Sequence, residues 1–179
     1  MSIHLNSHHG TFLPSFGCDI PFKDSKNIFT GGSKLDARVG SGVVCLDQKD
    51  DVLRQCEIRL NDKATVFLAE AFSILTALQR IRDDEKIRIY TDSQSVLQAL
   101  ESSRFQSNII LDIKKMLRHK KHVEFFWVKA HVGIYGNELA DVAAKNTTRR
   151  EAVDQVLGIP KSWLQYNLKQ DTLLKWQKR

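Results

Sequence analysis

The sequence has little of what marks a disulfide-stabilised or membrane-spanning protein. Its three cysteines, Cys18, Cys45 and Cys56, are widely spaced and odd in number, so they form neither a disulfide framework nor a Cys-x-x-Cys metal pair. No apolar run approaches the length that a bilayer-spanning helix needs, and the N-terminus lacks the basic start and apolar core of a signal peptide. We therefore expect an intracellular protein with reduced thiols and no membrane partner, in the nucleus or the cytoplasm.

The net charge of +6 is also unevenly placed. Residues 142–179 hold 8 Lys/Arg and 3 Asp/Glu, which accounts for most of the excess. A basic segment is compatible with binding to phosphate groups, and a solvated basic helix face explains it equally well. Charge alone therefore allows nucleic-acid binding without requiring it.

Composition and periodicity divide the chain into three parts. Residues 1–26 show no sustained period and are predicted to be a flexible leader or linker. Residues 27–148 carry regular strand and helix patterns and form the predicted domain. Residues 149–179 are predicted to be a basic C-terminal extension that is partly helical, with a helix from Ser162 onward.

Within the domain, an initial run of strands gives way to alternating helices and strands. The predicted elements, in order, are strands at residues 28–30, 39–46 and 52–60, a helix at 64–82, a strand at 86–91, helices at 95–100 and 108–119, a strand at 122–128 and a helix at 138–146. Residues 31–33 are expected to interrupt the first strand, and Gly40 and Gly42 to mark a bulge or a close backbone approach. This order predicts an α/β fold with a mixed sheet covered by helices.

Three acidic residues occupy positions that suit a metal site, although each has a simpler explanation. Glu70 lies at the edge of the apolar stripe of the first helix, where it could instead be a boundary residue with its carboxylate in water. Asp92 follows a strand and could be a helix N-cap. Asp141 is placed in the first turns of the last helix, where it could simply complement the helix dipole.

Taken together, the three acids are more informative. Sites in open α/β sheets gather at strand ends and helix starts, where these side chains can converge. Clustered carboxylates repel one another unless a cation lies between them, and hard oxygen ligands suit Mg²⁺ or Mn²⁺. Two such ions roughly 4 Å apart can activate a water and stabilise the leaving oxygen of a phosphodiester. The acids therefore predict a metal site that acts on a nucleic-acid backbone.

Four motifs that contain or flank these acids resemble those of the type 1 ribonuclease H family. They are residues 28–34 (IFTGGSK), 69–71 (AEA), 89–93 (IYTDS) and 127–141 (WVKAHVGIYGNELAD), in the order of that family. The last motif is the most specific, and together they cover the predicted domain. Their wording looks most like the ribonuclease H domain of a non-LTR retrotransposon polyprotein.

The resemblance implies a five-stranded mixed sheet, with an antiparallel meander and two parallel strands, and cleavage of the RNA strand of RNA–DNA hybrids. It also implies roles for the residues that match the motifs. Glu70 and Asp92 would hold one divalent metal ion, and Asp141 would hold the other and help to place the attacking water. His131 would assist proton transfer and product departure, although a surface histidine is the simpler alternative.

Further implied contacts concern the substrate and the rest of a polyprotein. Ser33 and Asn137 match substrate-contact positions, with turn chemistry as their alternative. The implied partners are an RNA–DNA hybrid and other domains of a reverse-transcriptase polyprotein. Because hybrids are recognised by groove shape and 2′-hydroxyls, little sequence preference is expected.

One position departs from the family pattern. Thr30 is normally followed by an aspartate that bridges both metal ions, and here the residue is Gly31. Asp36 is the nearest acid, but five strand residues span about 16 Å, so it could substitute only if the chain folds back sharply. The sequence therefore leaves three hypotheses: a ribonuclease H with weakened or altered metal use, a catalytically inactive nucleic-acid-binding domain from a decayed or repurposed retroelement, and a related nuclease or integrase. The third is disfavoured by the motif at residues 127–141.

Overall fold

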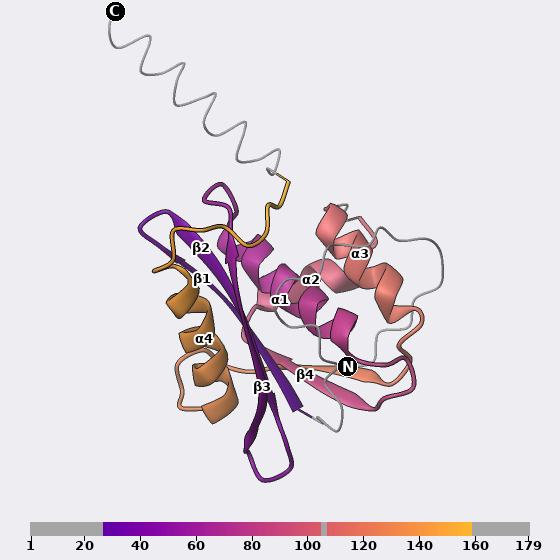
Figure 1. Cartoon of the computed structure of the whole chain (residues 1–179). Coiled ribbons are helices and arrows are strands. Elements are labelled where there is room, and N and C mark those ends of the chain that lie inside the picture. Colours follow the sequence, from indigo (N-terminus) through magenta and orange to yellow (C-terminus); the bar gives the residue numbers. More distant parts are fainter. Residues whose placement is uncertain (1–26, 105–106, 159–179) are drawn as a thin grey trace, which may run out of the picture.

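A computed structural model describes residues 27–104 and 107–158, and these contain the strands and helices in the predicted order (Figure 1). The strands are β1 (Asn27–Leu35), β2 (Arg38–Leu46), β3 (Val52–Leu60), β4 (Ile87–Thr91) and β5 (Val123–Trp127). The helices are α1 (Val66–Arg80), α2 (Gln94–Glu101), α3 (Asn108–Leu117) and α4 (Tyr135–Thr147). The leader and the helix predicted from Ser162 lie outside the described residues.

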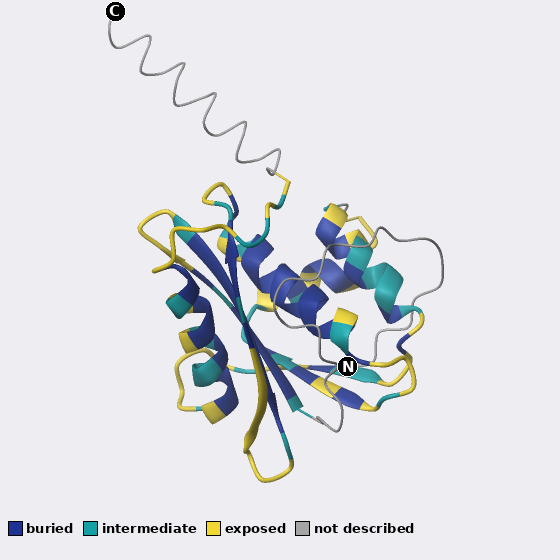
Figure 2. Ribbon diagram, viewed as in Figure 1, coloured by how far each residue is buried: buried dark blue, intermediate teal, exposed yellow. Residues whose placement is uncertain are grey.

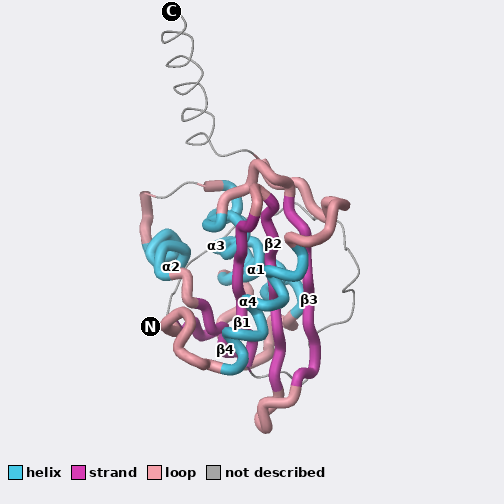
Figure 3. The backbone as a smooth tube through the Cα atoms, turned by 90° about the vertical axis from the view of Figure 1, so that its left-hand side faces the viewer, coloured by secondary structure: helices cyan, strands magenta, loops and turns pink. Residues whose placement is uncertain are grey.

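The strands form one mixed sheet in the order β3-β2-β1-β4-β5. The β1–β2 and β2–β3 pairs are antiparallel, and the β1–β4 and β4–β5 pairs are parallel. Helices α1, α2 and α3 cover one face of the sheet, and α4 packs on the other (Figures 1 and 3). The predicted fold class, an antiparallel meander plus two parallel strands flanked by helices, is confirmed.

The predicted interruption of β1 is wrong. The strand continues through residues 31–33, with Gly31 opposite Gly42 and Gly32 opposite Ser41 on β2. Although glycine weakens a strand interior, a helix approaches β1 closely at each of these two positions. A Cβ on Gly31 would lie 3.3 Å from the carbonyl carbon of Ala140 on α4, and one on Gly32 would lie 2.7 Å from the Glu70 nitrogen on α1. Tertiary packing therefore requires glycine at position 32, whereas at position 31 a small shift of α4 would admit a side chain.

The sequence predicted that Gly40 and Gly42 would mark either a bulge or a close backbone approach. The structure shows a close approach, between β2 and helix α4. A Cβ on Gly40 would overlap the carbonyl oxygen of Ala144, and one on Gly42 would overlap that of Ala140. The irregularity in the β2–β3 pairing lies elsewhere, between Cys45 and Leu46. Helix α4 thus rests directly on the backbone of β2.

The larger core lies between the sheet and the α1–α3 layer and is built from branched aliphatic side chains. Ile74, Leu78, Ile89, Ile110 and Ile113 are all completely buried there. Helix α1 begins at a cap in which the hydroxyl of Thr65 accepts a hydrogen bond from the Leu68 N–H at 3.2 Å. Figure 2 shows the buried faces of the sheet and helices turned toward one another, with the β2–β3 hairpin exposed beyond them.

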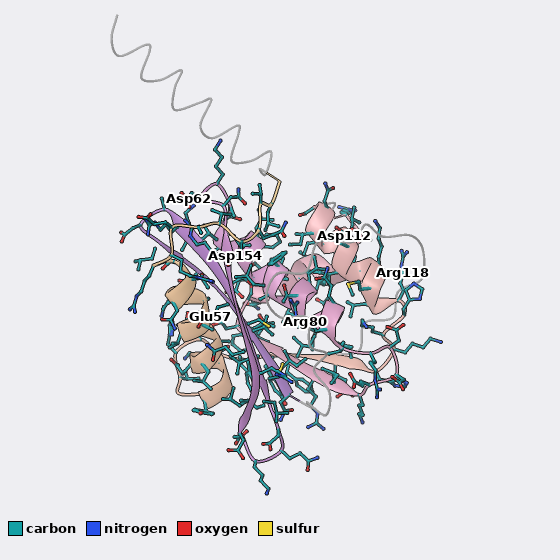
Figure 4. The ribbon with its side chains drawn as sticks, viewed as in Figure 1. Glu57, Asp62, Arg80, Asp112, Arg118 and Asp154 are labelled. Carbon is teal, nitrogen blue, oxygen red and sulfur yellow. The ribbon has the colours of Figure 1, made fainter. Side chains whose placement is uncertain are left out.

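The first part of the C-terminal extension is attached to the sheet. Gln155 forms a parallel bridge with Leu60 at the end of β3, and the carboxylate of Asp154 accepts a hydrogen bond from the Arg59 backbone N–H at 2.8 Å. The buried Arg59 side chain donates to the carbonyl oxygen of Arg150 at 3.1 Å. Asp154 is labelled beside this edge of the sheet in Figure 4. Residues 150–157 therefore pack as part of the folded unit.

No described helix combines the length and the hydropathy needed to cross a bilayer.

Candidate active site

Asp92 directly follows β4 and lies beside Gly31, because the last β1–β4 pair joins Thr30 to Thr91. The amide of Asn137 on α4 donates to Oδ2 of Asp92 at 3.3 Å, and the indole N–H of Trp127 donates to the Asp92 carbonyl oxygen at 3.2 Å. The alternative of a helix N-cap is wrong, since Ser93 occupies that position in α2. Side chains from α4 and β5 thus hold Asp92 at the end of the sheet.

Glu70 is buried between α1 and β1, with 6% of its surface exposed. One carboxylate oxygen, Oε1, accepts a hydrogen bond from the Gly32 N–H at 2.7 Å, and the other, Oε2, is buried without a partner. Burial raises the pKa of Glu70 well above its usual range, the charges of Asp92 and Asp141 raise it further, and the Gly32 N–H opposes the shift. The alternative of a boundary glutamate with its carboxylate in water is therefore wrong.

Asp141 lies on α4. The helix was predicted to start at Glu138 but starts at Tyr135, so Asp141 lies in its second turn. Its side chain is 17% exposed, and Oδ2 lies 2.6 Å from Nζ of Lys145. The same oxygen lies 3.7 Å from Nδ1 of His131, which is too far for a hydrogen bond. Asp141 therefore already has one cationic neighbour in the protein itself.

His131 comes from the loop that connects β5 to α4. Its side chain is 67% exposed and its backbone has a φ of +54°, in the left-handed region. Gly133 follows with a φ of +81°. Non-glycine residues in this region are uncommon, and such strain clusters at functional sites. The loop thus projects His131 toward Asp141 while leaving its ring accessible to solvent.

Glu138 is a candidate ligand that sequence reasoning missed. Ligand atoms of His131, Glu138 and Asp141 all lie within 4.8 Å of one another, so the three residues could hold a metal ion. The available signal was the spacing of Glu138 and Asp141, because residues three apart on a helix share one face. Lys145 was missed although it lies four residues beyond Asp141.

The two predicted substrate contacts differ in their surroundings. Asn137 is 3% exposed, and its amide is directed at Asp92, which suits a role in orienting that carboxylate. Ser33 is 9% exposed and lies two residues beyond Gly31 on the same face of β1. A substrate-contact role for either residue stays a prediction.

The donor set fits a divalent cation at one position better than at two. A buried carboxylate oxygen without a partner, next to further carboxylates that raise the pKa of its own group, is the environment that a hard cation would neutralise. Gly31 offers no side-chain oxygen between the acids. Asp36 does not replace it, because it lies exposed in the β1–β2 turn beyond the end of β1.

Comparison with known proteins identifies a family for most of the chain. A family model described as RNase H matches residues 23–149. The chain is 34% identical over 122 residues to the Pol polyprotein of Equine infectious anemia virus, a match that covers 66% of this chain and 10% of the polyprotein. It is 31% identical over 104 residues to the Ribonuclease H of Methylobacillus flagellatus, which covers 50% of this chain and 66% of that protein.

Among solved structures, a foamy viral protease-reverse transcriptase in complex with an RNA/DNA hybrid is similar in fold. The TM-score is 0.60 at 19% sequence identity, over 80% of this chain and 22% of that chain. At this identity the likeness concerns the fold alone. The chain thus spans about a tenth of the viral polyprotein and about a fifth of the reverse transcriptase chain that it resembles.

Proposed function

Because this chain belongs to the ribonuclease H family, we propose that it hydrolyses the RNA strand of RNA–DNA hybrids. The observation that carries the proposal is that Asp92 and Asp141 lie near enough to Glu70 to raise its pKa, while one carboxylate oxygen of Glu70 is buried without a partner. A cluster of this kind costs stability in the absence of a cation, which is typical of functional sites.

The described contacts support a separate role for each residue of the site. Glu70 and Asp92 would hold one divalent cation and Asp141, with Glu138 nearby, a second. Bound Mg²⁺ or Mn²⁺ would supply an acidified water and charge neutralisation at the scissile phosphate. Asn137 would fix the orientation of the Asp92 carboxylate. The exposed His131 would exchange a proton with the departing strand, since its ring is open to solvent.

Gly31 is the reason to expect weakened activity. Two dications about 4 Å apart repel by roughly 16 kcal/mol at an effective dielectric constant of 20, and a bridging carboxylate offsets much of this repulsion. The chain has no side chain at position 31 to do so. We therefore expect the second cation to bind less tightly than the first.

The same residue favours a second candidate function. A catalytically inactive domain that binds nucleic acid could keep the fold and most of the site while losing the bridging ligand. The two candidates make different predictions for the substitution Gly31→Asp, because only a site that is otherwise intact can regain activity.

The test is hybrid cleavage by the chain, Gly31→Asp and Gly31→Asn, each in Mg²⁺ and in Mn²⁺. A Cβ at position 31 would lie 3.3–3.4 Å from atoms of Ala140 and Asp141, so α4 needs to shift by only a few tenths of an ångström. We expect Gly31→Asp to raise the rate by roughly 10²-fold, where each tenfold step corresponds to 1.36 kcal/mol of barrier. Gly31→Asn supplies similar volume without the charge and should not reproduce the gain.

Other outcomes separate the candidates. Equal and robust rates for the chain and Gly31→Asp would show that Gly31 is harmless. Hybrid binding without cleavage by any of the three proteins would favour the inactive binding domain. Asp92→Asn serves as the control for contaminating nuclease, because it removes a proposed ligand from the same site.

The wider setting is also a proposal. The viral relatives are polyproteins, so we propose that this chain acts beside other domains of a reverse-transcriptase polyprotein. The wording of its motifs favours a non-LTR retrotransposon as the source. Recognition by groove shape and 2′-hydroxyls predicts cleavage with little sequence preference.

A further inference from the structure

Lys145 and Asp141 form a close ion pair at the edge of the carboxylate cluster. Nζ of Lys145 lies 2.6 Å from Oδ2 of Asp141, one turn away on α4. The two side chains differ in exposure, because Asp141 is 17% exposed and Lys145 is 52% exposed. The acid is therefore fixed against the site, whereas the ammonium can move into solvent at little cost.

This pair occupies an oxygen that a metal ion would use. Asp141 is one of the three residues whose ligand atoms lie within 4.8 Å of one another, and its Oδ2 is the atom that faces both Lys145 and His131. An ammonium group in hydrogen-bond contact with that oxygen blocks a coordination position. Its positive charge also opposes the approach of a dication.

We propose that Lys145 competes with the divalent cation for Asp141 and thereby lowers the affinity of the site for metal. The inference rests on the proposed function, since it concerns the same carboxylates. Lys145 acts through Asp141, so it is a positioning residue and not a catalytic one.

The lack of an acid at position 31 increases the expected effect of Lys145 on metal binding. With no acid at position 31, the described carboxylates near the site are Glu70, Asp92, Glu138 and Asp141. One ammonium group therefore offsets a larger share of the remaining negative charge than it would with an additional aspartate.

A simpler explanation is that the pair only stabilises α4. Asp–Lys pairs four residues apart support helices, and a lysine in the last turn complements the helix dipole. Helix α3 contains a comparable pair, in which Nζ of Lys115 lies 3.3 Å from Oδ1 of Asp112. Asp112 is labelled on α3 in Figure 4, on the face of the sheet opposite α4. This pair serves as a matched control, because its loss removes the same charge on the face of the sheet opposite Asp141.

The experiment measures Mn²⁺ binding to the full chain without nucleic acid, from the electron paramagnetic resonance signal of free Mn²⁺. We expect Lys145→Gln to bind Mn²⁺ about 3- to 5-fold more tightly at low ionic strength, the range of an exposed ion pair. The gain should shrink as salt is added, because exposed charges are screened. Lys145→Arg keeps the charge and should resemble the parent chain, as should Lys115→Gln.

Three results of this experiment would overturn the inference. Equal or weaker Mn²⁺ binding by Lys145→Gln would overturn the inference and leave the proposed function standing. An equal gain in Lys115→Gln would also overturn it, by showing a general effect of net charge. A lack of Mn²⁺ binding in the parent chain, Lys145→Gln and Gly31→Asp would overturn both the inference and the metal-dependent function.

Discussion

The two helical layers meet the sheet in different ways. On the α1–α3 side, long aliphatic side chains such as Leu78 and Ile113 fill the space between the helices and the strands. On the α4 side, glycines of β1 and β2 face alanines of the helix, and backbones almost touch. The first layer can adjust by changing rotamers, whereas a side chain added at Gly40 or Gly42 would meet backbone atoms of α4, which can yield only if the helix moves.

The difference matters because the candidate site draws on both layers. Glu70 comes from α1 and is buried, Asp141 comes from α4 and is partly exposed, and Asp92 follows β4 between them. The adjacent Gly31 and Gly32 face opposite helices at this point. The position of Asp141 relative to Glu70 therefore depends on how closely α4 can approach β1 and β2.

The largest expected effect comes from blocking that approach at Gly40→Ala. The new Cβ would overlap the carbonyl oxygen of Ala144, a backbone atom that cannot yield without moving α4. We expect the free energy of unfolding to fall by about 3 kcal/mol, at the upper end of overpacking effects. Urea denaturation measures this loss, and cleavage should fall with it.

Gly31→Ala is the control for that prediction. Its Cβ would meet α4 at 3.3 Å, a contact that a small shift relieves, and alanine gains roughly 0.5–1 kcal/mol over glycine inside a strand. We expect a net change of less than about 1 kcal/mol. A loss as large as that of Gly40→Ala would show that the α4 layer is uniformly rigid.

A change of the opposite sign is expected for Glu70→Gln on the α1 side. The amide keeps the hydrogen bond from the Gly32 N–H and removes the buried charge. We expect the metal-free protein to gain about 1 kcal/mol, or roughly 2–4 °C in Tm, because the neutral amide carries no charge that must be buried beside Asp92 and Asp141. Calorimetry measures the gain, and metal binding should be lost.

The pH dependence follows from the raised pKa of Glu70. Between the ordinary pKa of about 4.3 and the raised value, the folded protein holds a proton that the unfolded chain has released. The free energy of unfolding of the metal-free protein should therefore fall as pH rises through this window, and Glu70→Gln should lack that fall. Glu57→Gln, at a partly exposed glutamate labelled in Figure 4, should retain it.

The smallest expected effect concerns Trp127→Phe at the end of β5. The change removes the indole N–H that donates to the Asp92 carbonyl oxygen at 3.2 Å. Because Trp127 is 53% exposed, water can replace the bond, and we expect a loss of about 0.5 kcal/mol. Thermal denaturation and Mn²⁺ titration would detect it. A loss above that of Gly31→Ala would make Trp127 a principal support of Asp92.

Sequence reasoning anticipated the element order and the fold class because hydrophobic periodicity is a local property. It failed where the environment of a residue is set by a segment that is distant in the sequence. Residues 31–33 suggested a break in β1 because the helices that pack closely on Gly31 and Gly32 lie elsewhere in the chain. Glu70 was placed at the edge of the buried stripe, but packing against β1 buries it. Glu138 and Lys145 were missed because their relevance to the site depends on which way the Asp141 side chain points.

The sequence by itself determined the family, the order of the strands and helices, and the absence of an acid at position 31. All three can be read from local motifs and hydrophobic periodicity without knowing which distant segments touch. Only the tertiary structure decided that Glu70 is buried with a raised pKa, that Asn137 and Trp127 hold Asp92, and that Lys145 pairs with Asp141. The reason is that burial and charge pairing depend on distances between segments that are far apart in sequence or on the rotation of a helix against the sheet.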